Sequence, residues 1–292
     1  MTHTDLKTWS EMKTVLVADE IDDAGAPARI ARLRSILDYD DPDQYHAQLH
    51  HMVPFPYESL TLGFVSVWDN TWYTTSTVTP LYAGGRDRAF VHPQLAWSRD
   101  PEWQDWRRPI ERPPLLEPSE PGTWDCAAQL PYPDPVRMGD ELWLYYFGFS
   151  TVFNGPRGYG AGLPADDKVP PCGLGVATMR LDGYASLDAS PRGGVFITKP
   201  LIFKGSRLIL NARALGHISI ELLDPDGKPI PGFNRATIAG DSLRHDLLSA
   251  KGVDNRSWAR LGELAGKPIR LRFDLWNSEL YSLVFQESPE QR

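Results

Sequence analysis

A carboxyl group and an aromatic side chain stand next to each other at Trp124-Asp125, at the start of a segment typical of a β-strand. An aromatic ring offers a flat platform for a sugar ring, and a carboxyl group can transfer protons when burial raises its pKa. Cleavage of a glycosidic bond needs two such carboxyl groups. Asp125 is therefore our first candidate catalytic residue and Trp124 a substrate-binding candidate. The competing role for Asp125 is to cap a loop or to pair with an arginine.

Glu58 is the second candidate catalytic residue. It follows Pro54-Phe55-Pro56-Tyr57 and lies between two apolar segments, where it could reach a central pocket. A glutamate at a hairpin turn is more often simply solvated, which is the competing interpretation. His92 interrupts the apolar segment between Val91 and Pro93. It could contact a substrate at a pocket rim, or it could be a buried histidine whose ring nitrogens are hydrogen-bonded within the core.

Tyr45 and His46 begin the first long strand-like segment, and we expect them to bind sugar hydroxyl groups. His46 and His50 share one face of a strand, because side chains alternate along it. That spacing does not reproduce the helical zinc motif, and no carboxylate completes it. We therefore expect neither a metal site nor a cofactor.

A small polar residue followed by Asp and then by an aromatic or apolar anchor recurs around Asp5, Asp100 and Asp182. Repeats of several strands are typical of β-propellers, which gather their inner strands around one pocket. Short carboxylates at the outer turns of such repeats accept backbone N–H groups. We expect these three aspartates to hold turns rather than to act as acids.

Two sets of four strand-like segments follow, and four antiparallel strands are the unit of a propeller blade. The segments are residues 45–57, 60–68, 88–97 and a short one past Trp106, then 125–137, 141–149, 173–181 and 194–203. The Gly- and Pro-rich stretch 154–171 is long enough for a functional rim or lid.

Clean alternation of polar and apolar residues begins after Phe203, in residues 207–213, 217–222 and 269–275. A period of two indicates strands with one solvated face, as in a β-sandwich. The sequence therefore predicts an all-β fold, with a partial five-bladed β-propeller at residues 1–203 and a C-terminal β-sandwich at residues 204–292.

Several stretches of the chain resemble the C-terminal portion of five-bladed propeller glycoside hydrolases of the family 32 and 43 superfamily. They are residues 91–100, 122–125, 139–146 and 175–184, together with Leu210-Asn211 and residues 216–222 of the sandwich. The resemblance implies hydrolysis of O-glycosidic bonds in oligo- or polysaccharides by three acids on early blades. With two complete blades and the edge of another, the chain is expected to lack at least one of these acids. It could then be inactive as an N-terminally truncated form.

Two alternatives from other classes remain open. The chain could be a non-catalytic carbohydrate-binding or interaction module. It could also be a natural short form that makes a homo-oligomer through open blade edges, because unpaired strands recruit partners.

The overall charge and hydropathy exclude several partners. The net charge of −8 and the absence of a Lys/Arg cluster argue against a nucleic-acid surface. No apolar run is long enough to span a bilayer, and the N-terminus lacks a signal-peptide pattern. We expect a soluble protein, cytoplasmic or, if an N-terminal part is missing, secreted. Cys126 and Cys172 show no ligand spacing and are expected to be buried free thiols.

Overall fold

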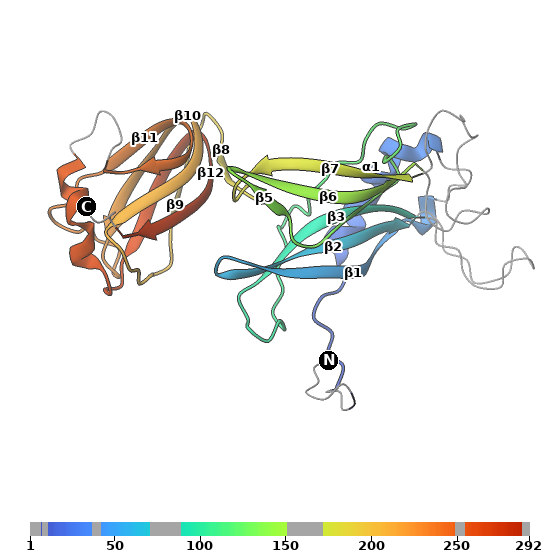
Figure 1. The fold of residues 1–292 in the computed structure, drawn as a ribbon, viewed down its shortest axis with the longest axis horizontal. Helices are drawn as coiled ribbons and strands as arrows, with labels where there is room; N and C mark the ends of the chain where they lie inside the picture. Colours follow the sequence, from blue (N-terminus) through green and yellow to red (C-terminus); the bar gives the residue numbers. More distant parts are fainter. Residues whose placement is uncertain are drawn as a thin grey trace, which may run out of the picture. The chain divides into compact units, whose positions relative to one another are not determined.

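The computed structural model describes residue 7 and residues 11–36, 42–70, 89–150, 172–248 and 255–287. These residues form two β-sheets, one of seven strands and one of five, with a single α-helix and three 3₁₀ segments among them (Figure 1). The predicted all-β fold is confirmed. No helix in the described ranges has the length and apolar character needed to cross a membrane.

The elements follow one another along the chain in a fixed order. They are α1 (Glu20–Leu33), η1 (Arg34–Ile36), η2 (Pro42–Gln44), β1 (His46–Tyr57), β2 (Leu60–Asn70), β3 (Ala89–Ser98), β4 (Ala128–Pro131), β5 (Val136–Met138), β6 (Glu141–Phe149), β7 (Cys172–Arg180), β8 (Leu187–Ala189), β9 (Gly194–Ile197), β10 (Arg207–Leu223), β11 (Ala236–Asp246), η3 (Asn255–Leu264) and β12 (Arg270–Gln286).

The first set of predicted strands is present as β1, β2 and β3, which pair antiparallel in that order. The short segment past Trp106 contributes an isolated bridge between Trp97 and Arg107. A single parallel pair, Val91 with Ala128, joins β3 to β4 and so links the first set to the second. The seven-stranded sheet therefore consists of two antiparallel groups joined at one point.

The second set contains β4, β6 and β7, but the predicted strand at 194–203 behaves differently. Its ordered part, β9, pairs with β12 of the five-stranded sheet. Phe196 of β9 stacks on Phe273 of β12 with ring centroids 4.7 Å apart. Burial of this aromatic pair explains why β9 joins β12. In the described residues β7 pairs with β6 alone, so its other side is an edge of the sheet.

The chain divides into two compact units. The N-terminal unit comprises Met1–Val136 and Trp143–Thr178, and the C-terminal unit comprises Arg137–Leu142 and Met179–Arg292. The main division falls at residue 178/179, whereas the sequence predicts 203/204. The pairing of β8 and β9 with β12 accounts for the earlier position.

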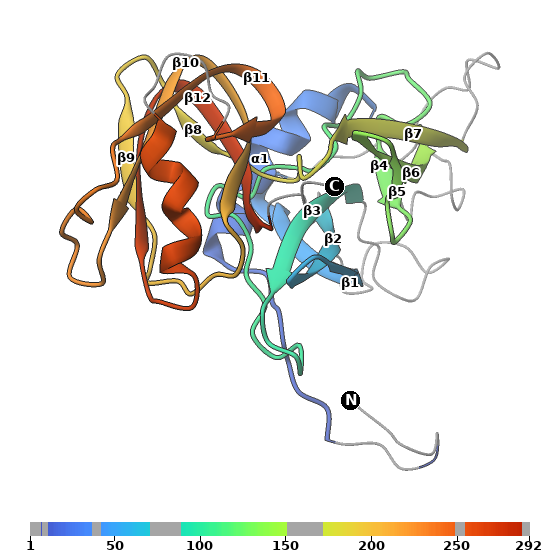
Figure 2. The same ribbon diagram turned by 60° about the vertical axis from the view of Figure 1, so that its left-hand side comes forward.

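The five-stranded sheet forms the core of the C-terminal unit. Its central strands, β10 and β12, are each 17 residues long and pair antiparallel over most of their length. The 3₁₀ segment η3 lies along this sheet (Figure 2). It contributes the fully buried Trp258 and Leu261 to the same cluster as the inward-facing residues of β10, β11 and β12. The alternation seen in the sequence thus becomes one apolar face covered by η3.

Helix α1 packs against the N-terminal sheet through Ala26, Ile30 and Leu33, which form a cluster with Phe90 and its neighbours. The helix begins at a capping box in which the Asp19 side chain accepts backbone N–H groups of the first turn. The same turn places the carboxylate of Asp22 at the sheet, where its side chain is 0% exposed.

The Asp22 carboxylate is neutralised by Arg108, whose side chain is only 2% exposed. The two nitrogens at the end of the guanidinium contact the two carboxylate oxygens, one of them at 2.7 Å. Arg108 also donates to Gln94 Oε1 at 3.2 Å and to the backbone oxygen of Val17 at 3.3 Å. Arg108 thus connects Asp22, at the start of α1, to Gln94 on strand β3.

Replacement of Arg108 by Met should destabilise the protein by about 3–5 kcal/mol, because Asp22 would keep a buried charge without its main partner. Its sequence neighbour provides a matched control. Arg107 pairs with Asp105 at 3.0 Å, but both side chains are more than 60% exposed, so Arg107→Met should change stability little. Urea unfolding followed by fluorescence measures both. Equal stability losses in the two variants would show that the Asp22 pair does not hold the helix.

Candidate functional site

The indole of Trp124 packs onto strands β6 and β7 at positions occupied by glycine. A Cβ atom at Gly148 would lie 2.5 Å from the ring, and one at Gly175 would lie 2.8 Å from it. Gly173 is similarly close, at 3.0 Å. Real Cβ atoms do not approach so closely, so these glycines create the space that the ring fills. Trp124 also stacks on Tyr146, with ring centroids 5.8 Å apart and planes 18° apart.

Asp125 lies beside this aromatic pair and is 4% exposed. The Tyr146 hydroxyl donates to Asp125 Oδ2 at 2.7 Å, and Thr123 Oγ1, which donates to Glu120 O at 2.7 Å, lies 3.4 Å from Asp125 Oδ1. Burial, together with the hydrogen bond to Asp125, raises the pKa of Tyr146 well above its ordinary value of 10.0. The phenol therefore stays protonated and remains a donor. We call Thr123, Trp124, Asp125 and Tyr146 the Trp124 cluster.

The Trp124 cluster combines three functions that hydroxyl-rich ligands need. The indole provides a flat apolar face, the carboxylate accepts hydrogen bonds, and the phenol orients the carboxylate. Sequence reasoning identifies Trp124 and Asp125 but misses Tyr146. The sequence signal for Tyr146 is the run of aromatic residues in β6, but such a run is first interpreted as packing between strands.

His92 lies in a different, buried polar network. Its Nδ1 is 3.3 Å from Asp69 Oδ2, and its Nε2 is 3.2 Å from Gln94 Nε2. Arg29 donates two hydrogen bonds of 2.7 Å to the two oxygens of Asp69. His92 and Asp69 are 2% and 1% exposed. We call Arg29, Asp69, His92 and Gln94 the Asp69 network.

The electrostatics of the Asp69 network favour the charged carboxylate. Burial by itself raises the pKa of Asp69, but the hydrogen bonds and charges of Arg29 and His92 outweigh it and hold this pKa below its ordinary value of 3.8. The sequence signal for Asp69 is a polar pair, Asp69-Asn70, at the end of the apolar strand β2. Its significance depends on Arg29, which is forty residues away.

The other predicted site residues occupy separate positions. Glu58 is exposed at the turn between β1 and β2, with a left-handed φ of 50°. Tyr45 packs against the buried cluster that contains Ile30 and Phe90. His46 Nε2 lies 3.0 Å from Gln48 Nε2 on β1. The described partners of Asp125 are Thr123 and Tyr146, so Glu58 is not one of them.

Of the repeated aspartates, Asp100 holds its turn as predicted. Asp100 accepts the backbone N–H groups of Glu102 and Gln104 at 3.0 and 2.8 Å. Asp182 has a φ of 60° and accepts from Ser282 Oγ at 2.6 Å. Asp5 lies outside the described residues, as does the predicted rim at 154–171.

Both cysteines are free thiols, but only Cys126 is buried. Cys172 is exposed because it begins the edge strand β7, which corrects the expectation that both are buried. In the part of the chain that the structure describes, no group of three or more His, Cys, Asp or Glu could hold a metal ion.

Comparison with known proteins places the chain near no established family. No family model and no curated protein matches it. Solved structures that resemble it include a complex of BT0996 and RGII, with 19% identity and a TM-score of 0.27, and a glycoside hydrolase, with 19% identity and a TM-score of 0.25. Each match covers 48% of this chain but 34% of the other.

A third structure is a glycoside hydrolase family 43 arabinoxylan arabinofuranohydrolase from Bacillus subtilis in complex with cellotetraose. It is 10% identical, has a TM-score of 0.20, and the match covers 82% of this chain and 54% of that one. The chain thus spans about a third of the length of the first two structures. TM-scores this low do not assign a function to the chain. A function has to be inferred from the geometry of its own residues.

Gly148→Ala should destabilise the N-terminal unit by about 1–3 kcal/mol, the usual effect of overpacking. The added methyl group would lie 2.4 Å from the Asp125 side chain and would displace Trp124. Gly194→Ala is the matched control, because its nearest neighbour would be Ala189 at 3.9 Å. Thermal unfolding of both variants, with tryptophan fluorescence, measures the effect. A Gly148→Ala protein as stable as the control would mean that Trp124 does not require the glycine.

The stabilisation by Asp69 should be present above about pH 4 and lost as the pH falls below it, because a lowered folded-state pKa favours the folded protein only while the carboxylate is charged. Asp69→Asn should therefore weaken the protein at pH 7 and flatten the fall in unfolding free energy between about pH 5 and pH 2. The exposed Asp226→Asn serves as a control. Unchanged acid dependence in Asp69→Asn would assign that dependence to other carboxylates.

Proposed function

We propose that the chain belongs to a glycoside hydrolase-like protein acting on O-glycosidic bonds of oligo- or polysaccharides. Its own contribution is to bind a saccharide at the Trp124 cluster. One observation carries the proposal, namely the placement of the Trp124 ring on three strand glycines directly beside the hydrogen-bonded Asp125 and Tyr146 pair. The ring is rigidly held, so little conformational entropy is lost when a ligand binds.

The hydrogen-bonding capacity of Asp125 supports a hydroxyl-bearing ligand. Tyr146 occupies one position on Oδ2, and Thr123 Oγ1 lies 3.4 Å from Oδ1. A carboxylate offers about four acceptor positions, so Asp125 retains capacity for a sugar hydroxyl. The Trp124 face supplies the apolar surface that sugar rings cover.

Saccharide binding is favoured over independent hydrolysis because hydrolysis needs a second carboxyl group across the scissile bond. The two carboxyl groups of a glycoside hydrolase lie about 5–9.5 Å apart, and Glu58, the second acid that the sequence offers, lies exposed at a hairpin turn. Catalysis by this chain would require a second acid from outside the Trp124 cluster. The positive features of the Trp124 cluster, a fixed aromatic ring beside a carboxylate, therefore support saccharide binding as the contribution of this chain.

Trp124→Ala should weaken saccharide binding roughly tenfold, the equivalent of about 1.4 kcal/mol. Asp125→Asn should weaken it severalfold with little change in shape. Trp103→Gly removes a tryptophan that is 48% exposed and preserves its positive φ, so it serves as the aromatic control. Calorimetric titration with xylo-, arabino-, galacto-, fructo- and cello-oligosaccharides measures affinity, and thermal melts verify folding.

Release of reducing ends by the same samples distinguishes binding from hydrolysis. Hydrolysis that disappears in Asp125→Asn would make the chain an enzyme with a second acid in reach. Equal affinity of wild type, Trp124→Ala and Asp125→Asn would remove the Trp124 cluster as the binding site.

A further inference from the structure

Strands β6 and β7 pair with each other and carry the Trp124 cluster on one of their two faces. Cβ atoms at Gly148 and Gly175 would both meet the Trp124 ring, so these two positions point toward it. Because side chains alternate along a strand, odd-numbered residues of β6 and even-numbered residues of β7 point to the other face. Among them are Tyr145, Phe147, Leu174 and Val176.

Large apolar side chains are exposed on this second face. Leu174 is 62% and Val176 47% exposed, whereas Tyr145 and Phe147 are 38% and 41% exposed. Tyr132 follows β4 and is 44% exposed. Its backbone N–H donates to Tyr145 O at 2.9 Å, and its ring centroid lies 5.6 Å from that of Phe147. We call these five residues the apolar β6–β7 face.

The strands that carry the apolar β6–β7 face have charged residues only at their outer ends. β6 begins with Glu141, β7 ends with Arg180, and the other residues of both strands are uncharged. Arg180 is already engaged, because it pairs with Asp241 at 2.9 Å and lies over the Tyr281 ring. A charged partner would therefore find no counter-ion on these strands at the middle of the face. These features favour an apolar partner.

The area of the apolar β6–β7 face fits an interface between two copies of the chain. Aromatic side chains cover about 150–250 Å² each, so the exposed parts of all five residues amount to roughly 400 Å² in each copy. Two copies would bury about 800 Å² through these side chains alone, and a specific interface needs about 1,000 Å² in total. Residues around the face supply the remainder.

The edge strand β7 provides a second reason for self-association. In the described residues it pairs with β6 alone, and it contains no proline and no charged residue before Arg180. Exposed edges in natural proteins usually carry charges or prolines that discourage contact with other chains. β7 lacks that protection, and its exposed Leu174 and Val176 extend the apolar β6–β7 face to the edge.

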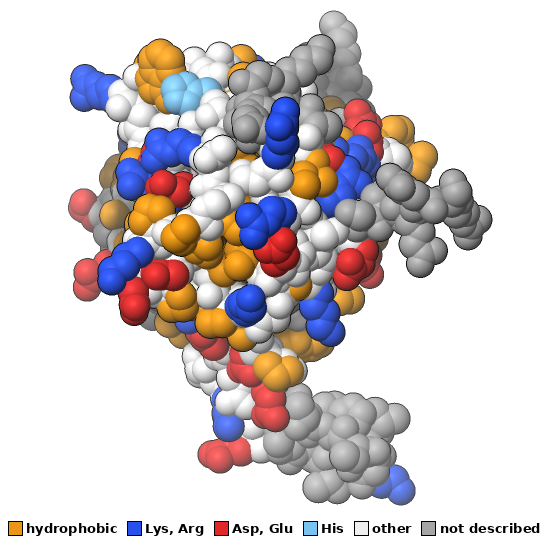
Figure 3. Space-filling model, turned by 90° about the vertical axis from the view of Figure 1, so that its left-hand side faces the viewer, with side chains coloured by type: hydrophobic (Ala, Val, Ile, Leu, Met, Phe, Trp, Pro, Cys, Tyr) orange, Lys and Arg blue, Asp and Glu red, His pale blue; other side chains and the backbone are white. Residues whose placement is uncertain are grey.

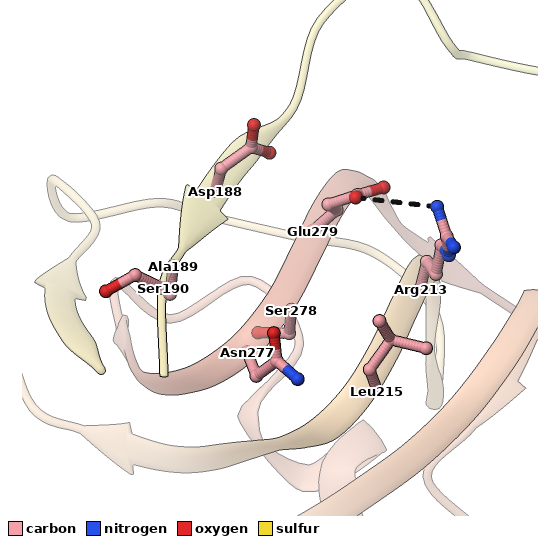
Figure 4. A pocket seen from close by; sticks show the side chains of 8 residues that line it. All are labelled: Asp188, Ala189, Ser190, Arg213, Leu215, Asn277, Ser278 and Glu279. Atoms are coloured by element: carbon pink, nitrogen blue, oxygen red, sulfur yellow. Dashed lines mark ion pairs between the residues drawn. The ribbon is translucent and has the colours of Figure 1, made fainter. Parts of the chain in front are cut away.

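Other surfaces of the protein carry charge and suit self-association less well. A cavity of about 300 Å³ between β8, β10 and β12 is lined by Asp188, Arg213 and Glu279 among others, and Arg213 lies 3.7 Å from Glu279 (Figure 4). The face of the molecule shown in Figure 3 intersperses hydrophobic side chains with acidic and basic ones. Burial of such groups between two copies would require a partner for each charge. The apolar β6–β7 face imposes no such requirement.

We propose that the protein forms a two-fold symmetric dimer in which the apolar β6–β7 faces of two copies pack against each other, sheet on sheet. An uncharged apolar face is complementary to itself, and two-fold packing covers the same patch in both copies at once. Packed sheets lie about 10 Å apart, which allows side chains such as Phe147 and Val176 to interdigitate. The Trp124 cluster is on the opposite face of these strands, so the dimer contact does not use it.

Sedimentation velocity of the full chain over a range of micromolar concentrations tests the dimer. We expect the mass to rise to that of two chains as the concentration increases. Val176→Lys and Phe147→Lys should each raise the dissociation constant about tenfold or more, because the interface would bury a charge without a partner. Ile110→Lys is the matched control. Ile110 is 75% exposed in the same unit but outside the apolar β6–β7 face, so this variant should dimerise like the wild type.

Variants on the two strands distinguish packing through the face from pairing through the β7 edge. Phe147 and Tyr145 lie on β6, which is not the edge strand. Tyr145→Lys should therefore weaken the dimer as Phe147→Lys does, and it replaces that variant if thermal melts show that Phe147→Lys does not fold. A chain that is monomeric at every concentration, or a dimer of equal affinity in the wild type and the face variants, would overturn the proposal. Loss of affinity in Val176→Lys alone would also overturn it, because the contact would then be at the β7 edge.

Discussion

The burial of two aspartate carboxylates, Asp22 and Asp69, constrains how helix α1 packs on the N-terminal sheet. Each carboxylate must be neutralised, because an unpaired charge in the interior costs several kcal/mol. Arg108 neutralises Asp22, and Arg29, itself on helix α1, neutralises Asp69 on β2. Two ion pairs therefore anchor the helix. In one the helix supplies the carboxylate of Asp22, and in the other it supplies the guanidinium of Arg29. The helix also makes apolar contacts with the sheet, through Ile30 among others.

Similar logic applies to the Trp124 cluster, where steric space replaces charge as the constraint. A tryptophan can lie flat on a sheet only where the strands below carry no side chain. Gly148 on β6 and Gly175 on β7 supply that gap. The position of Trp124 in turn sets the place of Asp125, which meets the Tyr146 hydroxyl at 2.7 Å. A candidate recognition surface thus arises from missing side chains as much as from those that are present.

In the C-terminal unit the decisive feature is an imperfection in an otherwise regular ladder. Strands β10 and β12 pair over long stretches, and their buried faces pack on η3. Where the register shifts between Ala214 and His217, the backbone at Asn277 turns left-handed and a polar cavity opens. Bulges commonly redirect side chains in this way and are found near functional sites.

The sequence by itself determined the all-β class, most strand positions and the turn-holding role of Asp100, because these depend on local alternation and local hydrogen bonds. It also offered Trp124 and Asp125, which are adjacent in the chain, as candidate site residues. Only the tertiary structure decided that β9 pairs with β12, that Tyr146 orients Asp125, and that Arg29 meets Asp69 across forty residues. Such contacts arise when distant segments compete to bury apolar area and pair charges, and no local pattern records that outcome.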